Sequence, residues 1–490
     1  MQEQFLRAQR WRLAVAAIVV LLSCLRCAHI HLLWADEDYH VAAALQILHG
    51  KVPYRDFWYD KPPLSALYYA LIGAHAGWLL RLQDAAYVLL ACYLTYRFAR
   101  TWWGEAEGWA AALLMAFFTT FYLPSAIIPF AADALMIVPH LAAVSCAARK
   151  RPFGAGIWTG IAFLVNAKAL FVLVVCAVWV WPAWGQLFAG FAVPAVAAFV
   201  SALFCGAWTG YIEQVWRWGL LYARGSPVVH PFWLGIVSTT HWLGFHSALL
   251  IGAAFGIFAS SREQHRKLTW WLLLSFAAVG LGTRFAPHYF LQLLPAMVIV
   301  ASRGVVIAMR DFRKPAMLVL AVTLLVPFIR FAPRYASLTY DDLMHRNPQW
   351  IDVVLDLDSQ DVARRIRHLA RPSDTLFVWG YRPDIYVYTR TIAAGLFWDS
   401  QPLTGVPADR HLHATTAIYG GPAAADREEL IRTHPPFLVD GLSLLNPKLD
   451  PSIYPELRPW LAEYELVDRT KLSLIYERRD YVRSFNSQPR

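Results

Sequence analysis

Long apolar stretches recur through the first two thirds of this 490-residue chain, and they limit what it can fold into. A helix needs about 20 mostly apolar residues to cross a hydrocarbon core of roughly 30 Å. The sequence therefore predicts a mostly α-helical, polytopic membrane protein with about eleven transmembrane helices. We expect these helices near residues 13–33, 83–100, 105–123, 128–148, 154–168, 169–183, 187–208, 233–258, 268–284, 287–302 and 315–332.

The composition agrees with a membrane protein. Hydrophobic residues make up 58% of the chain and charged residues only 16%, against about 25% charged residues in soluble domains. The net charge of +10 does not indicate nucleic-acid binding, because Lys and Arg gather in short loops and form no basic stripe. All six cysteines lie within apolar stretches, which predicts packing and not a disulfide framework.

The basic loops predict how the chain is oriented in the cytoplasmic (inner) membrane. Arg7 and its basic neighbours precede the first apolar stretch, which is typical of a retained signal anchor with a cytoplasmic N-terminus. The cluster at residues 149–151 falls on the same side only if residues 64–80 do not cross the membrane. That segment is short, and His75 and two glycines interrupt it, so we expect an interfacial helix there. The C-terminal third then lies outside the cytoplasm.

The composition changes sharply near Tyr335, where charged residues return. We therefore divide the chain into a transmembrane domain, residues 1–334, and a small extracytoplasmic α/β domain, residues 335–490. Within the second domain the patterns predict a helix at 362–370, strands at 375–380 and 436–441, a short helix or turn at 382–388, and a β-hairpin at 464–479.

The first outer loop, residues 34–82, carries three consecutive acids: Asp36, Glu37 and Asp38. A short amphipathic helix follows them, and Gly50 is a typical stop for it. We expect this helix to lie on the membrane surface. One acid at its start would serve as a helix cap. Three acids beside a bilayer indicate a functional role for at least one of them.

The same loop contains a cation on a stiffened turn. Asp60 and Lys61 precede Pro62 and Pro63, which fix the backbone and prevent a helix before Leu64. A lysine held at the level of the lipid headgroups is a natural partner for a lipid phosphate. The simpler alternative is a lysine that extends its amine to the interface.

Further polar residues lie at the outer ends of later spans. Asp133 is an acid near a span end, which indicates function by default, although helix capping is the alternative. Lys168, Arg284 and His288 fall on the same side in this topology. His288 is equally well explained as a packed, hydrogen-bonded histidine.

This pattern resembles the GT-C membrane glycosyltransferases, a superfamily of membrane-embedded enzymes. It is most similar to the bacterial relatives of protein O-mannosyltransferases and lipid A aminoarabinose transferases. The resemblance is carried by the following residues: Asp36, Glu37, Tyr39, Gly50, Pro53, Tyr54, the Asp60-Lys61-Pro62-Pro63 motif, Asp133, and the run from His288 to Pro295. It covers roughly residues 10 to 332. The loop is shorter than in the aminoarabinose transferases and has the extra acid Asp38.

The resemblance implies an inverting transfer of a sugar from a polyprenyl-phosphate carrier, outside the cytoplasm, to a lipid, glycan or protein acceptor. It makes Asp36 the general base, Asp133 a second acid of the site, and Lys61 the lysine near the lipid phosphate. Glu37 and Asp38 remain alternatives for the base. Asp38, Tyr54, Asp60, Lys168, Arg284 and His288 are expected to bind substrate. Related enzymes also allow a divalent cation, Mg²⁺ or Mn²⁺, but the sequence shows no firm ligand set for one.

The chemistry agrees with the resemblance. Nucleotide sugars are absent outside the cytoplasm, so an activated sugar must arrive on a lipid. The reaction needs a carboxylate that takes the acceptor's proton and a cation that stabilises the leaving phosphate.

Two alternatives from other classes remain open on the sequence. A transporter or flippase would place charges near the bilayer midplane, often within repeats, whereas here the acids gather at one edge and no repeat is visible. The second alternative is a catalytically inactive scaffold that presents the C-terminal domain to a partner.

Overall fold

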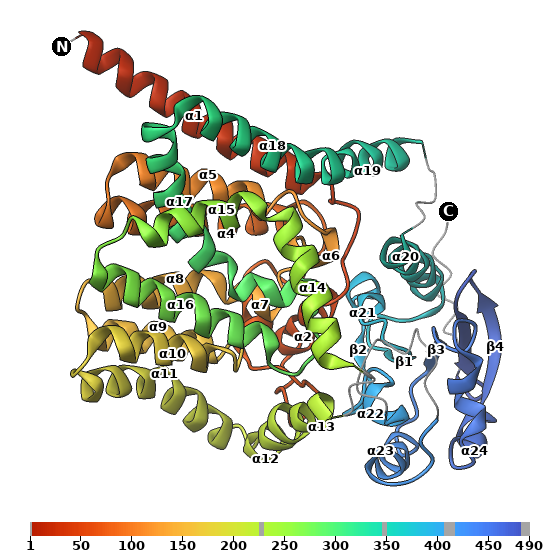
Figure 1. The fold of residues 1–490 in the computed structure, drawn as a ribbon. Coiled ribbons are helices and arrows are strands. Elements are labelled where there is room, and N and C mark those ends of the chain that lie inside the picture. Colours follow the sequence, from red (N-terminus) through yellow and green to blue (C-terminus); the bar gives the residue numbers. More distant parts are fainter. Residues whose placement is uncertain (1, 225–229, 345–349, 406–416, 482–490) are drawn as a thin grey trace.

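The computed structural model describes residues 2–224, 230–344, 350–405 and 417–481 (Figure 1). A large helical bundle makes up the N-terminal two thirds, and a smaller unit with one sheet lies beside it. The predicted fold class, mostly α-helical with a small C-terminal α/β domain, is confirmed.

The bundle consists of long apolar helices joined by short connections. The long helices are α1 (Gln2–Cys27), α4 (Trp78–Trp102), α5 (Glu105–Phe118), α8 (Ile137–Ala148), α9 (Pro152–Phe163), α10 (Ala169–Val180), α11 (Trp184–Phe204), α14 (Pro231–Phe245), α15 (Ser247–Phe258), α16 (Arg262–Gly280), α17 (Leu294–Asp311) and α18 (Arg313–Phe331). The shorter ones are α2 (Glu37–Leu48), α3 (Leu64–Ala70), α6 (Pro124–Ile127), α7 (Ala132–Leu135), α12 (Trp208–Tyr211), η1 (Ile212–Arg217), α13 (Trp218–Arg224), η2 (Pro287–Gln292) and α19 (Pro333–Leu343).

Each expected span contains a helix, but several helices are shorter than predicted. Within the described residues, two helices are long and apolar enough to cross a membrane: Trp184–Phe204 and Arg313–Asp341. The pair α14 and α15 would add a third if it is one span, and it is bent by 88°. The expected span 128–148 is divided between α7 and α8, and the expected span 287–302 begins as the 3₁₀ helix η2. Both irregular segments carry the polar residues of the site described below.

The segment 64–80 does not form a span, as predicted. Its helix, α3, has only seven residues, or about 10 Å of length, which is far less than a membrane requires. The chain then turns through Gly73 and Gly77, both with positive φ, before α4 begins.

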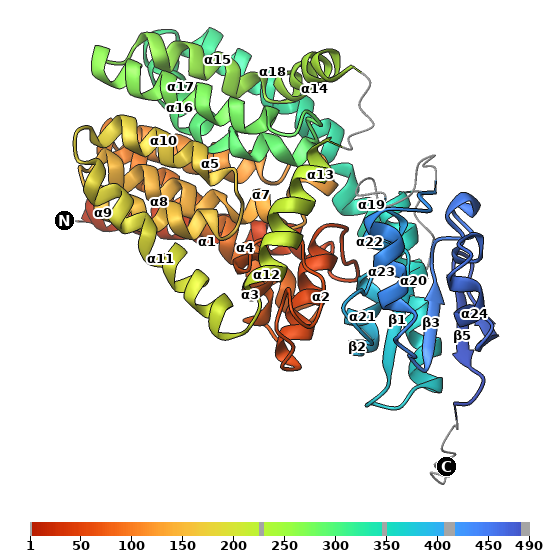
Figure 2. The same ribbon diagram turned by 90° about the horizontal axis from the view of Figure 1, so that it is seen from below.

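The helix after the acids is buried within the protein, which the sequence pattern does not predict. Ten of the twelve residues of α2 are buried. Figure 2 shows α2 between the helical bundle and the sheet-containing unit, next to α21. The C-terminal domain covers the face that the sequence pattern would have placed toward solvent, so the helix is enclosed by protein on both sides.

The C-terminal domain holds a five-stranded sheet of order β2-β1-β3-β5-β4. Its elements are α20 (Ile351–Leu369), β1 (Thr375–Trp379), α21 (Asp384–Thr389), β2 (Ile392–Ala393), α22 (Gln401–Thr404), α23 (Pro422–Leu430), β3 (Phe437–Asp440), η4 (Pro447–Leu449), η5 (Pro451–Ile453), α24 (Leu457–Leu461), β4 (Tyr464–Arg469) and β5 (Leu474–Arg478). The central strand β1 pairs in parallel with β2 and β3, and β4 and β5 form an antiparallel hairpin. The predicted strands, short helix and hairpin are confirmed, and the predicted helix begins earlier, at Ile351.

Hydrogen bonds hold the C-terminal domain against the first outer loop. The Trp58 amide donates to the Leu396 carbonyl at 2.7 Å. The Ala393 amide donates to the side chain of Gln46 at 3.1 Å. The loop that carries the predicted site is therefore enclosed between the two parts of the molecule.

Candidate active site

Four carboxyl groups lie near one partly buried tyrosine where the first outer loop meets the C-terminal domain. Tyr381 follows β1, and burial raises the pKa of its hydroxyl well above the usual value. The charges of four carboxylates raise it further: Asp38, Asp36, Asp60 and Asp399. Three of the four were expected at the site from the sequence.

A stack of aromatic rings ties these segments together. The ring of Tyr39 lies between those of Tyr59 and Tyr381, with centroid distances of 5.4 and 5.6 Å. The Asp60 amide donates to the Tyr39 hydroxyl at 3.3 Å. Because Tyr39 belongs to α2 and Tyr381 to the C-terminal domain, the stack fixes the acids of both parts relative to each other.

Asp36 has the geometry of a functional residue more than of a helix cap. It occupies the N-cap position of α2, yet its side chain accepts no hydrogen bond from that helix. Its φ of +74° lies in the left-handed region, which costs a non-glycine residue about 1–3 kcal/mol and is typical of active sites. The side chain is partly exposed.

The other two acids of the run have different surroundings. Glu37 is fully buried, and its carboxylate pairs with Arg81 at 2.6 Å and accepts the Trp34 amide at 2.8 Å. This arrangement favours a structural role for Glu37. Asp38 is also buried, and it accepts the amide of Tyr39 at 2.7 Å. Of the three, Asp36 is the acid most open to a substrate.

Lys61 lies beside these carboxylates on the turn made by the two prolines. Its ammonium is 2.8 Å from Asp60, and its side chain is 38% exposed. Its carbonyl accepts the hydroxyl of Tyr54 at 2.8 Å. Tyr54 is itself in the left-handed region at φ +70° and is buried. Its contact with Lys61 holds the turn in place.

A second polar cluster is built around Asp133. The Oδ1 atom of Asp133 accepts hydrogen bonds from Lys168 at 3.0 Å, Gln292 at 2.7 Å and Asn166 at 3.1 Å. The Nε2 atom of His288 is 3.8 Å from the other carboxylate oxygen. The structure therefore brings together three residues that the sequence predicted separately: Asp133, Lys168 and His288.

Backbone contacts join the two clusters. The Leu64 amide, directly after the proline turn, donates to the Leu164 carbonyl at 3.1 Å. The Ser65 hydroxyl donates to Val165 at 3.3 Å. Asn166, the next residue, binds Asp133. The turn of Lys61 and the loop that carries Lys168 are thus neighbours in the structure.

Arg284, the remaining predicted residue, lies in the loop between α16 and η2, four residues before His288. Thr283 and Phe285 on either side of it have positive φ. The loop is therefore held in an unusual backbone path just before the Asp133 cluster.

The sequence analysis missed several residues of the site. Asn166 lies two residues before Lys168, and Gln292 lies four residues after His288. The four-residue spacing places Gln292 one helical turn from His288, and this spacing could have identified it from the sequence. No local sequence pattern indicated that Asp399 belongs to the site. Burial and the charge of Asp60 raise the pKa of its carboxyl to about 7, whereas the charge of Lys61 and a hydrogen bond from Gln401 act in the opposite direction.

Within the described part of the chain, no three His, Cys, Asp or Glu side chains are grouped closely enough to hold a metal ion. The reaction proposed below includes no step through a metal ion.

The arrangement of the helices and the outer loop, with one small α/β domain over the acids, is the GT-C fold. Two crystal structures of ArnT, an aminoarabinose transferase, from Cupriavidus metallidurans carry this assignment. The ArnT structure bound to undecaprenyl phosphate has a TM-score of 0.58 and 16% identity, over 96% of this chain and 98% of that chain. The apo form has a TM-score of 0.57 at the same identity and coverage. The expected resemblance is therefore confirmed at the level of the fold.

The apo oligosaccharyltransferase of Archaeoglobus fulgidus is less similar in structure. Its TM-score is 0.48 and its identity 12%, over 88% of this chain and 70% of that chain. It adds nothing to the assignment. No protein-family model and no curated protein sequence matches the chain.

Proposed function

We propose that this protein is an inverting glycosyltransferase of the cytoplasmic membrane. It would transfer a sugar from a polyprenyl-phosphate carrier to a lipid, glycan or protein acceptor on the outer face. The observation that carries the proposal is that an accessible carboxylate, Asp36, and the Asp60-Lys61 ion pair on the proline turn both lie near Tyr381. ArnT, whose fold this chain shares, has been crystallised with undecaprenyl phosphate.

Asp36 is the residue we assign as the general base. Its carboxylate takes the proton of the acceptor hydroxyl while the acceptor oxygen bonds to the anomeric carbon. The bond from that carbon to the phosphate oxygen breaks on the opposite face, and its electrons stay with the phosphate. Attack from the opposite face inverts the anomeric configuration.

Lys61 is the residue we assign to the leaving phosphate. A preorganised ammonium stabilises charge that develops on the departing oxygens, and its effect is larger where water is excluded. Asp60 holds this ammonium at 2.8 Å before substrate binds. We assign Tyr54 to the positioning of this turn.

The Asp133 cluster is the second part of the proposed site. Three donors, Lys168 among them, saturate one oxygen of the Asp133 carboxylate, and His288 lies 3.8 Å from the other oxygen. We propose that Lys168 and His288 bind the donor's phosphate or sugar, with Arg284 on the adjoining loop.

The topology and domain boundaries belong to the same proposal. The N-terminus would be cytoplasmic, residues 1–334 would form the catalytic membrane domain, and residues 335–490 the extracytoplasmic domain. The basic turn at 312–314 lies at the opposite end of α17 from the Asp133 cluster, which supports placing the site at the outer face.

The direct test is a comparison of the glycolipids, glycans and glycoproteins of wild-type cells and of cells that lack the gene. Mass spectrometry should show one class of molecule lighter by one sugar in the deletion strain. Complementation with the Asp36→Asn variant should fail. Asp361→Asn, a change in a surface acid paired with Arg364 and Arg365, should restore the sugar. Identical profiles in all strains would reject the proposal.

A further inference from the structure

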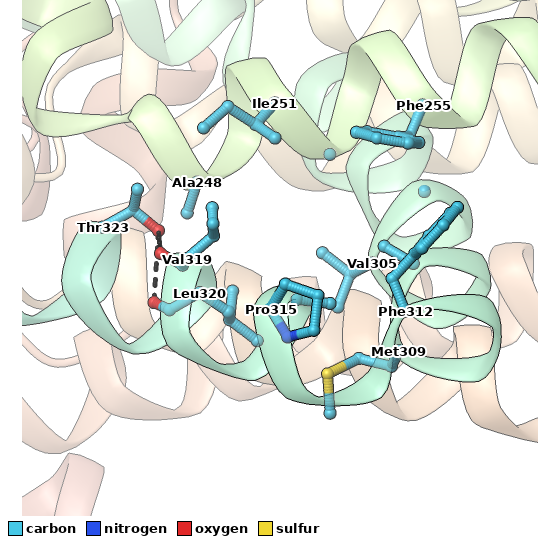
Figure 3. Close-up of a pocket in the computed structure, with 14 residues that line it drawn as sticks. Ala248, Ile251, Phe255, Val305, Met309, Phe312, Pro315, Val319, Leu320 and Thr323 are labelled. Atoms are coloured by element: carbon cyan, nitrogen blue, oxygen red, sulfur yellow. Dashed lines mark hydrogen bonds between the residues drawn. The ribbon is translucent and has the colours of Figure 1, made fainter.

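An apolar pocket of about 340 Å³ lies between α15, α17 and α18, away from the candidate active site (Figure 3). Its walls include the following side chains: Ile251, Phe255, Val305, Phe312, Val319 and Thr323. An apolar cavity of about 150 Å³ already stays dry and accepts a molecule the size of benzene. This pocket is more than twice as large.

The packing of the three helices explains the space. A Cβ atom on Gly304 of α17 would overlap the Gly252 carbonyl oxygen of α15, so these two helices touch through their backbones. In contrast, α18 buries only Pro327 and Phe331, both near its C-terminal end. Its N-terminal part stands away from α15 and α17, and the pocket lies in the gap.

The walls offer no polar partner to a ligand. Thr323 has the only hydroxyl among the lining side chains, and it donates to the carbonyls of Val319 and Leu320 within its own helix (Figure 3). A sugar or nucleotide would lose its hydrogen bonds to water here without replacement. An extended hydrocarbon chain would lose none.

Cations stand at one end of the pocket. Phe312 and Pro315 line that end, and Arg313 and Lys314 between them are exposed. Arg310 also lies there and pairs with Asp311 at 2.7 Å. Charges at the rim of an apolar pocket match a molecule with an anionic head and a hydrocarbon tail. Each basic residue near a membrane surface raises the affinity for anionic lipids about fivefold.

The pocket is separate from the proposed donor site. Helix α17 starts at Leu294, directly after the Asp133 cluster, and ends beside Phe312. The 18 residues between these positions correspond to about 27 Å along the helix. A lipid whose phosphate lies at Arg313 therefore belongs to the other leaflet from a donor whose phosphate lies at Lys61.

We infer that this pocket is a binding site for one acyl chain of an anionic phospholipid of the cytoplasmic leaflet, whose phosphate is bound by Arg313 and Lys314. The lipid fills the gap under α18 and fastens the N-terminal part of this helix to α15 and α17.

The test uses the purified full-length protein in detergent and a phosphatidylglycerol probe with a photoreactive group on one acyl chain. Mapping of cross-linked peptides should place the label on residues 248–258 and 304–323. The double substitution Ala308→Phe with Ala316→Phe, which fills the pocket, should reduce labelling at least about tenfold. Arg313→Gln with Lys314→Gln should reduce it at least about fivefold and leaves the packing intact.

Matched controls separate this site from general contact with lipid. Ala197→Phe changes an exposed alanine of α11, and Arg149→Gln with Arg151→Gln removes two exposed cations from another loop. Neither should change the labelling. Equal labelling by a phosphatidylcholine probe, label spread over all apolar helices, or labelling that survives the filled pocket would each overturn the inference. Displacement of the probe by polyprenyl phosphate would instead assign the pocket to the donor's chain and overturn it as well.

Discussion

At the scale of single residues, the Asp133 cluster shows how charge can be held in an apolar bundle. Lys168 and Asp133 are each less than a tenth exposed, and they are 3.0 Å apart. Removing one partner of a buried pair leaves an uncompensated charge and typically costs 3–5 kcal/mol, whereas replacing both together costs far less. This difference allows a structural and a catalytic role of the pair to be separated.

We therefore expect Lys168→Met to lower the thermal stability of the purified protein strongly. The double variant Asp133→Asn with Lys168→Met should regain most of the lost stability but no transfer activity. Melting temperatures and a transfer assay on the same preparations measure both. Recovery of activity in the double variant would mean that the pair serves only folding.

Asp399 is one residue whose protonation should affect stability near neutral pH. The pKa of its carboxyl is about 7 in the folded protein and about 3.9 in an unfolded chain. At a pH between these two pKa values, the Asp399 carboxyl is protonated in the folded protein and deprotonated in the unfolded chain. The free energy of unfolding should therefore fall as the pH rises from about 4 to about 7.

Asp399→Asn keeps the oxygen that accepts the Gln401 amide but cannot lose a proton. We expect its melting temperature to decline less between pH 5 and 8 than that of the wild type, and to exceed the wild-type value at pH 8. Asp361→Asn, at the surface of α20, should follow the wild-type curve. Parallel curves for Asp399→Asn and the wild type would contradict the assignment.

At the scale of elements, the sequence predicted the parts that depend on local pattern. Apolar stretches located the helices of the bundle, and alternating patterns located β1, β3 and the hairpin β4–β5. It did not reveal the burial of α2, because this helix packs against α21, more than 300 residues away, as well as against α3. Asp399 was missed for the same reason. It reaches the site only because the C-terminal domain lies against the first outer loop, which no local pattern reveals.

The turn that carries Tyr54 depends on a glycine in a distant helix. A Cβ atom on Gly210 of α12 would overlap the carbonyl oxygen of Tyr54, and the Tyr54 hydroxyl in turn binds Lys61. Gly210→Ala should therefore displace the turn and reduce transfer by at least about tenfold, because small misplacements at reacting groups are costly.

Gly219→Ala is the matched control for this prediction. No atom lies within 4 Å of the position of its Cβ, and Ala favours a helix over Gly by about 1 kcal/mol. Activity should be unchanged, and stability unchanged or slightly higher. Equal activity of the Gly210→Ala variant would show that the turn tolerates the shift.

At the scale of the whole molecule, the C-terminal domain completes the acidic side of the site. Arg390, directly after α21, donates to the carbonyls of Ala74 and Gly73 at 2.5 and 3.0 Å. These bonds join the C-terminal domain to the connection between α3 and α4. We expect Arg390→Met to weaken this contact and to lower transfer activity by about three- to tenfold.

Arg364→Met provides the comparison, because Arg364 pairs with Asp361 at the protein surface, where such pairs contribute about 0–1 kcal/mol. It should keep full activity. If both variants are equally active, the C-terminal domain does not need this contact to hold Tyr381 and Asp399 beside Asp36.

The central claim is most directly tested by the fate of the sugar on its polyprenyl carrier. Purified protein would be incubated with a detergent-solubilised envelope extract of a deletion strain, which holds both the donor and its acceptor, and the polyprenyl-phosphate lipids would be followed by mass spectrometry. We predict that the sugar-linked form disappears, that free polyprenyl phosphate appears in equal amount, and that Lys61→Gln abolishes both changes. A carrier that keeps its sugar, or one that only changes sides in sealed vesicles, would contradict the account and indicate a flippase.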